Sequence, residues 1–276
     1  MVLSVNTNAA ALIALQNLNA TESQLQSTQN EVSTGLAVGN AKDNASVWAI
    51  AQGQRADIGA LDAVTMSLNR ATSIADVAST AGQSVSDLLT QLKSKVVGAM
   101  DSSLTTASRT ALNNDFTSIL NQINDVINNA NFDGANILNG SLPNGLQFLA
   151  NADGSSTLTL SGQNLTLGGS IITIASTASI TTATLAAALL TQVNTSLSNV
   201  DAALGNLGSQ STEISNHTTF IGKLQDVLDT GVGNLVNANM ATESAKLQAL
   251  QVQQQLGIQA LSIANQAPQA ILALFK

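Results

Sequence analysis

Hydrophobic residues recur at helical spacing along most of this chain, and its two ends show the most regular pattern. Near each end, apolar positions fall seven residues apart, and the residues between them are mainly Asn, Gln, Ser, Thr and Ala. Registers of this kind form the apolar stripe of a coiled coil, so both ends are predicted to be long helices that pair through their stripes. This predicted terminal seam comprises Leu12, Leu15, Leu18, Leu25 and Val32 near the N-terminus, and Met240, Leu247, Leu250, Leu261 and Ile271 near the C-terminus.

One stripe is too little to hold the first helix rigid in a lone molecule. Ordering each residue costs about 1–2 kcal/mol of backbone entropy, and the first helix has to order roughly 30 residues. Burying each of its few large aliphatic side chains returns only roughly 1.5–3 kcal/mol. The C-terminal stretch is uncharged from Leu247 to Phe275, so its other faces also suit apolar partners. We therefore expect the ends to be mobile in the monomer and to become ordered when further helices cover them on assembly.

The middle of the chain alternates between helical and short-strand patterns. Residues 46–130 and 181–230 carry apolar residues at three- and four-residue spacing, which is typical of amphipathic helices. Between them, residues 131–180 contain turn dipeptides such as Asp133-Gly134 and short alternating runs, which predict β-hairpins. The four runs predicted as strands are 146–149, 157–160, 165–167 and 171–174.

The predicted fold class is mainly α. We expect a long helical-bundle rod with paired N- and C-terminal coiled-coil helices, a small β-hairpin insert at one tip and both termini at the other. Glycine pairs, Gly35 with Gly39 and Gly231 with Gly233, mark two linkers that interrupt the helices. The predicted segments are a helix in 1–34, a linker in 35–45, helices in 46–130, the β-hairpin region in 131–180, a helix in 181–230, a linker in 231–236 and a helix in 237–276.

Composition narrows the functional classes. The 276 residues are 44% hydrophobic but only 2% aromatic and 9% charged, which suits thin helical packing better than the compact core of an enzyme. A net charge of −8 argues against a nucleic-acid partner, because binding phosphates requires a basic surface. No membrane insertion is predicted, because the polar residues 253–255 and Asn265 interrupt the apolar C-terminal stretch. The chain contains no Cys, which excludes disulfides and thiolate sites.

Candidate catalytic and metal-binding residues are scarce. His217 is the sole histidine, and Glu213, one helical turn earlier, is the only carboxylate that supports it. A structural or surface role is therefore predicted for His217. No catalytic residue, cofactor-binding residue or metal ligand is predicted, and we do not expect the chain to be an enzyme.

Several local motifs are more specific than the helical periodicity. The most distinctive is the ending, Ala264-Asn265-Gln266-Ala267-Pro268-Gln269 followed by Leu272. Other motifs are Val5-Asn6-Thr7-Asn8 with Ala11-Leu12, Ser33-Thr34-Gly35 followed by 40–45, and Asn131-Phe132-Asp133-Gly134 with Ile137-Leu138. Together they make the chain resemble a bacterial flagellin of the short alphaproteobacterial type, and the resemblance covers essentially its whole length.

The resemblance implies a structural subunit that polymerises into the bacterial flagellar filament, a secreted, extracellular homo-oligomer. It also implies export of the unfolded chain, an export chaperone, assembly at the distal tip, and contacts with flagellar cap and junction proteins. Residues 1–34 and 237–276 would form the two halves of an inner coiled-coil layer, and the helices in 46–130 and 181–230 a second layer. The outer variable domains of larger relatives would be absent. An alternative is a hook–filament junction protein, an adaptor that shares flagellin-like termini.

Many flagellins carry O-linked sugars, so the resemblance also gives a second interpretation to the hydroxyl-rich stretches, which otherwise suit solvated loops. The candidate O-glycosylation residues are Ser155, Ser156, Thr157, Thr177, Ser179, Thr181 and Thr182.

Overall fold

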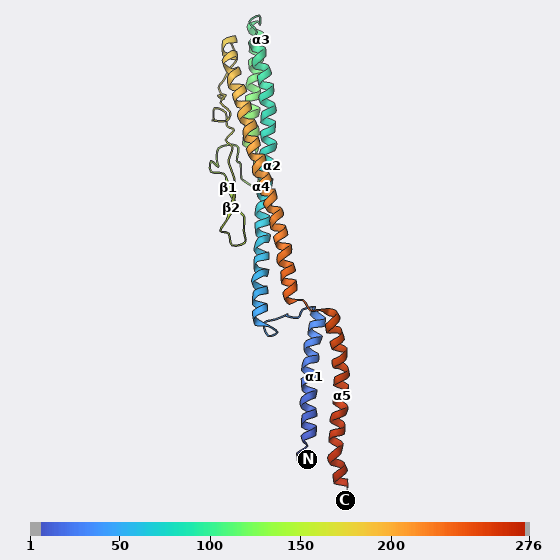
Figure 1. The fold of residues 1–276 in the computed structure, drawn as a ribbon. Coiled ribbons are helices and arrows are strands. Elements are labelled where there is room, and N and C mark those ends of the chain that lie inside the picture. Colours follow the sequence, from blue (N-terminus) through green and yellow to red (C-terminus); the bar gives the residue numbers. More distant parts are fainter. Residues whose placement is uncertain (1–6, 274–276) are drawn as a thin grey trace. The chain divides into compact units, whose positions relative to one another are not determined.

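The computed structural model describes the backbone of residues 7–273 and the side chains of residues 7–266. This part of the chain forms five helices and one two-stranded antiparallel hairpin (Figure 1), which confirms the predicted mainly α fold class. The chain divides into two compact units: the terminal unit, up to Ala56 and from Val227 onward, and the central unit, 57–226. The elements are α1 (Ala9–Thr34), α2 (Ala45–Ala99), α3 (Thr106–Asn129), β1 (Leu146–Leu149), β2 (Thr157–Leu160), α4 (Ala183–Val236) and α5 (Met240–Ala273).

In the terminal unit, α1 and α5 lie side by side and run antiparallel (Figure 1). Asn8 caps α1 by accepting a hydrogen bond from the Ala11 N–H, and its amide donates to the carbonyl of Ala264 at 2.7 Å. Farther along, Leu18 lies against Gly257, where an added Cβ would come within 3.2 Å of Leu18 Cδ1. The start of α1 therefore faces the end of α5, and the predicted pairing of the terminal helices is confirmed.

A short backbone pairing, here called the terminal tie, joins the residues after α1 to those before α5. Gly35 ends α1 with φ +73°, a left-handed conformation that glycine adopts without strain. The N–H groups of Ala37 and Val38 both donate to the carbonyl of Val236, at 2.7 and 3.2 Å. In return, the N–H of Ala238 donates to the carbonyl of Gly35 at 2.8 Å. The tie fixes where α1 ends relative to where α5 begins.

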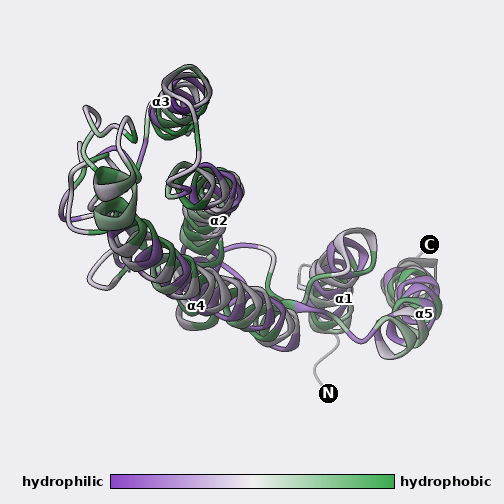
Figure 2. Ribbon diagram, turned by 90° about the horizontal axis from the view of Figure 1, so that it is seen from above, coloured by the Kyte–Doolittle hydropathy of each residue, from purple (hydrophilic) through white to green (hydrophobic). Residues whose placement is uncertain are grey.

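The central unit is a bundle in which α2 and α4 lie side by side and α3 turns back along α2 (Figures 1 and 2). Lys95 of α2 pairs with Asp115 of α3 at 2.7 Å, and Arg109 donates hydrogen bonds to the carbonyls of Ala99 and Asp101. The core of the bundle consists of large aliphatic and aromatic side chains that are almost fully buried, namely Leu68, Leu89, Leu92, Phe116, Leu120, Ile123 and Ile127.

The hairpin pairs β1 with β2 so that Leu146 lies opposite Leu160 and Leu149 opposite Thr157. Hydrogen bonds attach it to the middle of the long helices: the Leu149 N–H donates to Ser67 Oγ of α2 at 3.2 Å. The predicted position of the hairpin at a tip is therefore wrong: the hairpin lies along the side of the bundle. Its apolar side chains, such as Phe148 and Leu160, are buried there, and a tip position would leave them exposed.

Two of the four predicted strands do not form. Residues 165–167 and 171–174 are irregular loop, although their alternating pattern does bury Leu165, Ile172 and Ile174. Their backbone groups bond to other loops and to side chains: the Leu165 N–H donates to the Leu138 carbonyl at 2.8 Å, for example. Alternating apolar and polar residues indicate that every second side chain is buried. A loop that packs against a helical bundle can produce this pattern as well as a strand can.

The predicted linker 231–236 is helical. The helix α4 continues through Gly231 and Gly233 to Val236, and the break falls at residues 237–239 instead. Glycine costs about 1 kcal/mol in a helix interior. Here Val232 and Val236 are buried, and that packing outweighs the helix-breaking tendency of the glycines.

Candidate assembly surface

The structure brings only part of the terminal seam together. Leu18, Leu25 and Leu250 are buried between α1 and α5. Val32, Leu247 and Leu261 are half-buried, whereas Leu12, Leu15 and Met240 remain 63%, 43% and 43% exposed. Ile271 lies outside the described side chains. Pairing of α1 with α5 within one copy therefore buries the middle of the predicted terminal seam and leaves the side chains at its ends exposed.

The contact between α1 and α5 is thin because small and polar residues occupy much of it. Gly257 has no side chain to cover Leu18, and Thr21 and Thr28 are buried in positions that an aliphatic residue would fill in a typical coiled coil. Thr21 Oγ1 donates to the Asn17 carbonyl within α1, but Thr28 Oγ1 has no hydrogen-bond partner in the described part of the chain. This pairing holds the two helices close without a large hydrophobic core.

A second apolar stripe runs along α5 on residues that stay largely exposed beside α1. Val252, Leu256 and Ile263 follow helical spacing and are 56%, 60% and 68% exposed. On α1, Leu12 and Ile13 are exposed to a similar degree. Figure 2 shows hydrophobic residues on several sides of both helices. These α5 residues lie outside the seven-residue registers that predict the terminal seam, and their own four- and seven-residue spacing is the sequence signal that identifies them.

The electrostatics of this surface favour apolar contacts. The described charged residues of α1 and α5 are Glu22, Glu31, Glu243 and Lys246, and Lys246 Nζ lies 3.3 Å from Glu243 Oε2. The bare stripe on Val252, Leu256 and Ile263 therefore contains no charge that would have to be desolvated on contact.

His217 has a structural contact, as predicted. Its Nε2 lies 2.6 Å from the carbonyl of Ala150, just after β1, so the ring donates a hydrogen bond that holds the hairpin to α4. Its ring also lies 5.8 Å from that of Phe220. Among the described residues, no group of three or more side chains of metal-binding type comes together.

The candidate glycosylation residues lie in two places, the hairpin turn and the approach to α4. Ser155 is the least available of them, because its hydroxyl donates to Asp153 Oδ1 and accepts from Asn151 Nδ2, each at 2.9 Å. Hydrogen bonds from the backbone and side chain of Ser155 lower the pKa of Asp153 below its usual value. The other exposed candidates are Ser156, Thr157, Thr177, Thr181 and Thr182, and Ser179 is half-buried.

None of the described helices has the length and apolar character needed to cross a membrane. Terminal helices that pair with each other and keep apolar stripes exposed are typical of self-assembling structural proteins, and this is the class that the fold and the surface indicate.

Comparison with known proteins identifies the family. Residues 5–142 match the model of the bacterial flagellin N-terminal helical region, and residues 190–275 match that of the C-terminal helical region. The chain is 49% identical to flagellin FljM of Caulobacter vibrioides over 99% of its own length and 98% of that protein. It is 50% identical to flagellin FljN of the same organism with the same coverage, and 38% identical to a flagellin of Brucella melitensis over 99% of both chains.

The chain belongs to the bacterial flagellin family. It is a structural subunit of the flagellar filament, a secreted, extracellular structure.

Proposed function

We propose that subunits join through the bare stripes of the terminal unit. The observation that carries this proposal is the exposure of Val252, Leu256 and Ile263 on a helix whose other side already contacts α1. Covering such a patch with the corresponding helices of other copies removes it from water, at about 25 cal/mol per Å² of apolar surface. The same burial, repeated at each contact, offsets the entropy of ordering the terminal helices.

Seeded assembly tests this proposal. Purified full-length protein and a variant lacking residues 237–276 are each mixed with short flagellar fragments, and growth is followed by electron microscopy. We expect long filaments from the full-length protein alone. Equal growth of the truncated chain would contradict the proposal, and a short collar from the full-length protein would favour the junction-adaptor alternative.

A point variant separates the bare stripe from the whole helix. The double substitution Leu256→Ser with Ile263→Ser removes exposed apolar surface and leaves the described contacts with α1 in place. Its matched control is Gln251→Ser with Gln259→Ser, two exposed polar positions on the same helix. Seeded growth is expected to stop in the first variant and to continue in the control.

We also propose that before export a chaperone covers the bare stripe of α5. An exposed, uncharged apolar helix face associates non-specifically in the cell unless a partner occupies it. The Leu256→Ser and Ile263→Ser variant is expected to bind such a chaperone at least tenfold more weakly than the glutamine control, measured by calorimetry with purified components. Equal affinity would exclude this stripe as the chaperone site.

O-glycosylation of the hydroxyl clusters remains a proposal supported by their exposure. Intact mass of the protein from its native source gives the number of sugars. Peptide mapping is expected to place them on the exposed group around Thr157 or Thr181 rather than on the hydrogen-bonded Ser155. We further propose that the protein has a purely structural role without catalysis. We also propose that cap and junction proteins bind the bare stripes of the terminal unit.

A further inference from the structure

The segment between α3 and β1 contains two Asn-Gly pairs, Asn139-Gly140 and Asn144-Gly145. In such a pair the backbone nitrogen of the glycine can attack the side-chain amide of the asparagine, because glycine has no side chain that hinders the approach. Both glycines have positive φ, +77° and +70°, so each pair forms part of a tight turn. The two pairs are alike in sequence and differ in the hydrogen bonds at their reacting atoms.

At the first pair, the side-chain carbonyl of Asn139 is held beside the Gly140 peptide. Its Oδ1 accepts a hydrogen bond from the Ser141 N–H at 3.0 Å, which forms an Asx turn around the Gly140 nitrogen. A backbone N–H that donates to a carbonyl oxygen also stabilises the negative charge that develops on this oxygen when a nucleophile attacks the carbon. Neither the Gly140 N–H nor Asn139 Nδ2 makes a hydrogen bond to another described residue, so the nucleophile and the leaving group are both unoccupied.

At the second pair, the nucleophile is occupied. The Gly145 N–H donates to the Leu142 carbonyl at 3.0 Å, and this bond retains the proton that has to leave before the nitrogen can attack. The side chain of Asn144 makes no hydrogen bond to a described residue that would hold its carbonyl in place. Asn144 is exposed and Asn139 is half-buried, so exposure favours reaction at Asn144, whereas the hydrogen bonds favour reaction at Asn139.

We propose that Asn139 deamidates spontaneously and in preference to Asn144, which makes it a modification site of this chain. The Gly140 N–H gives its proton to water, and the nitrogen attacks Asn139 Cγ to form a cyclic imide. The bond from Cγ to Nδ2 breaks, and Nδ2 takes up a proton and leaves as ammonia. Water then opens the imide: cleavage at the side-chain carbonyl gives aspartate, and cleavage at the backbone carbonyl gives isoaspartate. Water is the sole co-reactant, and nothing is oxidised or reduced.

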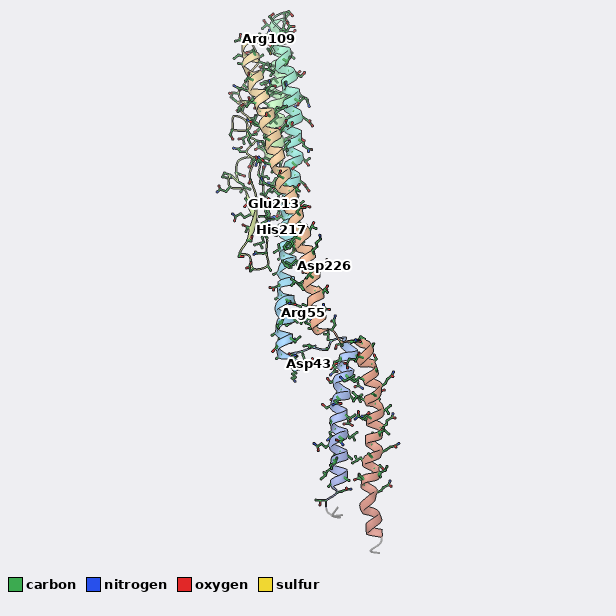
Figure 3. The ribbon with its side chains drawn as sticks, viewed as in Figure 1. Asp43, Arg55, Arg109, Glu213, His217 and Asp226 are labelled. Atoms are coloured by element: carbon green, nitrogen blue, oxygen red, sulfur yellow. The ribbon has the colours of Figure 1, made fainter. Side chains whose placement is uncertain are left out.

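The segment that carries Asn139 is anchored on both sides. On one side, Asn136 Nδ2 donates to the carbonyl of Ile127 in α3 at 2.7 Å, and Asn136 Oδ1 accepts from the Asn139 N–H at 3.2 Å. On the other side, the hairpin is held by His217 of α4 (Figure 3), whose Nε2 bonds to the Ala150 carbonyl. A change in backbone length at Asn139 therefore has to be absorbed between these two anchors.

The two products differ in their effect on this segment. Aspartate keeps the backbone length and an oxygen that can accept from the Ser141 N–H. Isoaspartate adds a methylene group to the backbone and moves the former side-chain carbonyl into the peptide. Either product adds negative charge to the subunit, so the modified fraction of a sample records the time since its synthesis.

A comparison of the two pairs in one chain tests the proposal. Full-length protein is incubated at mildly alkaline pH, and tandem mass spectrometry of proteolytic peptides follows the conversion of each asparagine with time. In the folded protein, Asn139 is expected to react at least about tenfold faster than Asn144. In urea the two rates should approach each other, because both the Asx turn and the Gly145 hydrogen bond are lost. Equal rates in the folded protein, or faster reaction at Asn144, would overturn the proposal.

A matched pair of variants tests the role of the Ser141 N–H. Ser141→Pro removes this donor, and Ser141→Ala keeps it while removing the hydroxyl group. Conversion of Asn139 is expected to slow at least about tenfold in the proline variant and to keep its rate in the alanine variant. Labelling by an isoaspartyl methyltransferase gives a second readout of the same conversion. Equal rates at Asn139 in the two variants would show that the Asx turn does not promote the reaction.

Discussion

The central and terminal units use similar helices in opposite ways. In the central unit, large side chains such as Phe116, Leu68 and Leu89 are fully buried within one copy. In the terminal unit, the contact between α1 and α5 relies on Leu18, Leu25 and Leu250 together with glycine and threonine, while longer apolar side chains face outward. The central unit buries its large side chains within one copy, whereas the terminal unit leaves apolar side chains exposed, and we propose that other copies cover them. Helical periodicity alone does not distinguish the two, because both patterns repeat at the same spacing.

The largest effect is expected from opening the core of the central unit. Phe116→Ala leaves a cavity among Leu120, Ile123 and their neighbours and should lower the free energy of unfolding by about 3–5 kcal/mol. Urea unfolding of the monomer, followed by far-UV circular dichroism, measures this loss. Trp48 is the sole tryptophan and lies in the terminal unit, so its fluorescence reports whether the terminal unit is affected.

Within the terminal unit, buried and bare leucines should behave differently. Leu250→Ala removes a buried side chain from the contact with α1 and should weaken that pairing by about 2–3 kcal/mol, near the low end for leucine truncations. Leu256→Ala truncates an exposed side chain and should change the pairing by less than about 0.5 kcal/mol. Amide hydrogen exchange in α1 of the monomer measures both. Equal loss of protection would show that the bare stripe is already covered in the monomer.

The segment between α3 and β1 offers a third comparison, between two glycines in left-handed conformations. At Gly145, φ is +70° and an added Cβ would come within 2.2 Å of the Leu160 carbonyl oxygen, whereas at Gly134, φ is +80° with open space around it. Gly134→Ala should cost about 1–2 kcal/mol from backbone strain alone. Gly145→Ala adds a clash with backbone and should disrupt β1–β2 pairing, which the backbone chemical shifts of residues 146–160 detect. Similar spectra for the two variants would show that the clash relaxes easily.

The smallest expected change is a stabilisation. Thr28→Val replaces a buried hydroxyl that has no hydrogen-bond partner with a methyl group of the same shape, which should strengthen the α1–α5 pairing by about 1 kcal/mol. Thr21→Val serves as the control, because its hydroxyl already bonds to the Asn17 carbonyl. Hydrogen exchange again provides the measurement, and a loss of protection in Thr28→Val would indicate that the hydroxyl has a partner in solution.

Much of this architecture could be predicted from spacing. The seven-residue registers correctly indicated that the two ends pair, and clustered Asp-Gly and Asn-Gly dipeptides located the hairpin. Residue spacing led to wrong predictions where the same sequence pattern is compatible with two different local structures. Leu165 and Ile172 alternate like strand residues because one face is buried, yet a loop buries them. Gly231 and Gly233 suggested a linker because glycine weakens helices, yet tertiary packing of Val232 and Val236 decided the outcome.

The assembly surface could be predicted only in part. Heptad spacing identified Leu18, Leu25 and Leu250, which face the partner helix. It also included Leu12 and Met240, which this partner leaves uncovered. Which apolar residue is covered depends on the offset between the two helices, and that offset is set by contacts such as Asn8 with Ala264, more than 250 positions apart in the chain. No local pattern contains that information.

Because the contacts of the terminal unit join the first and last parts of the sequence, only a full-length chain can form them. Asn8 finds its partner at Ala264, and the terminal tie joins Ala37 to Val236, so the paired helices exist only after nearly the entire polypeptide has been made and delivered. A prematurely ended chain lacks α5, and with it both the terminal tie and the bare stripe. If the bare stripe carries the contacts between subunits, as we propose, such incomplete copies cannot join the polymer.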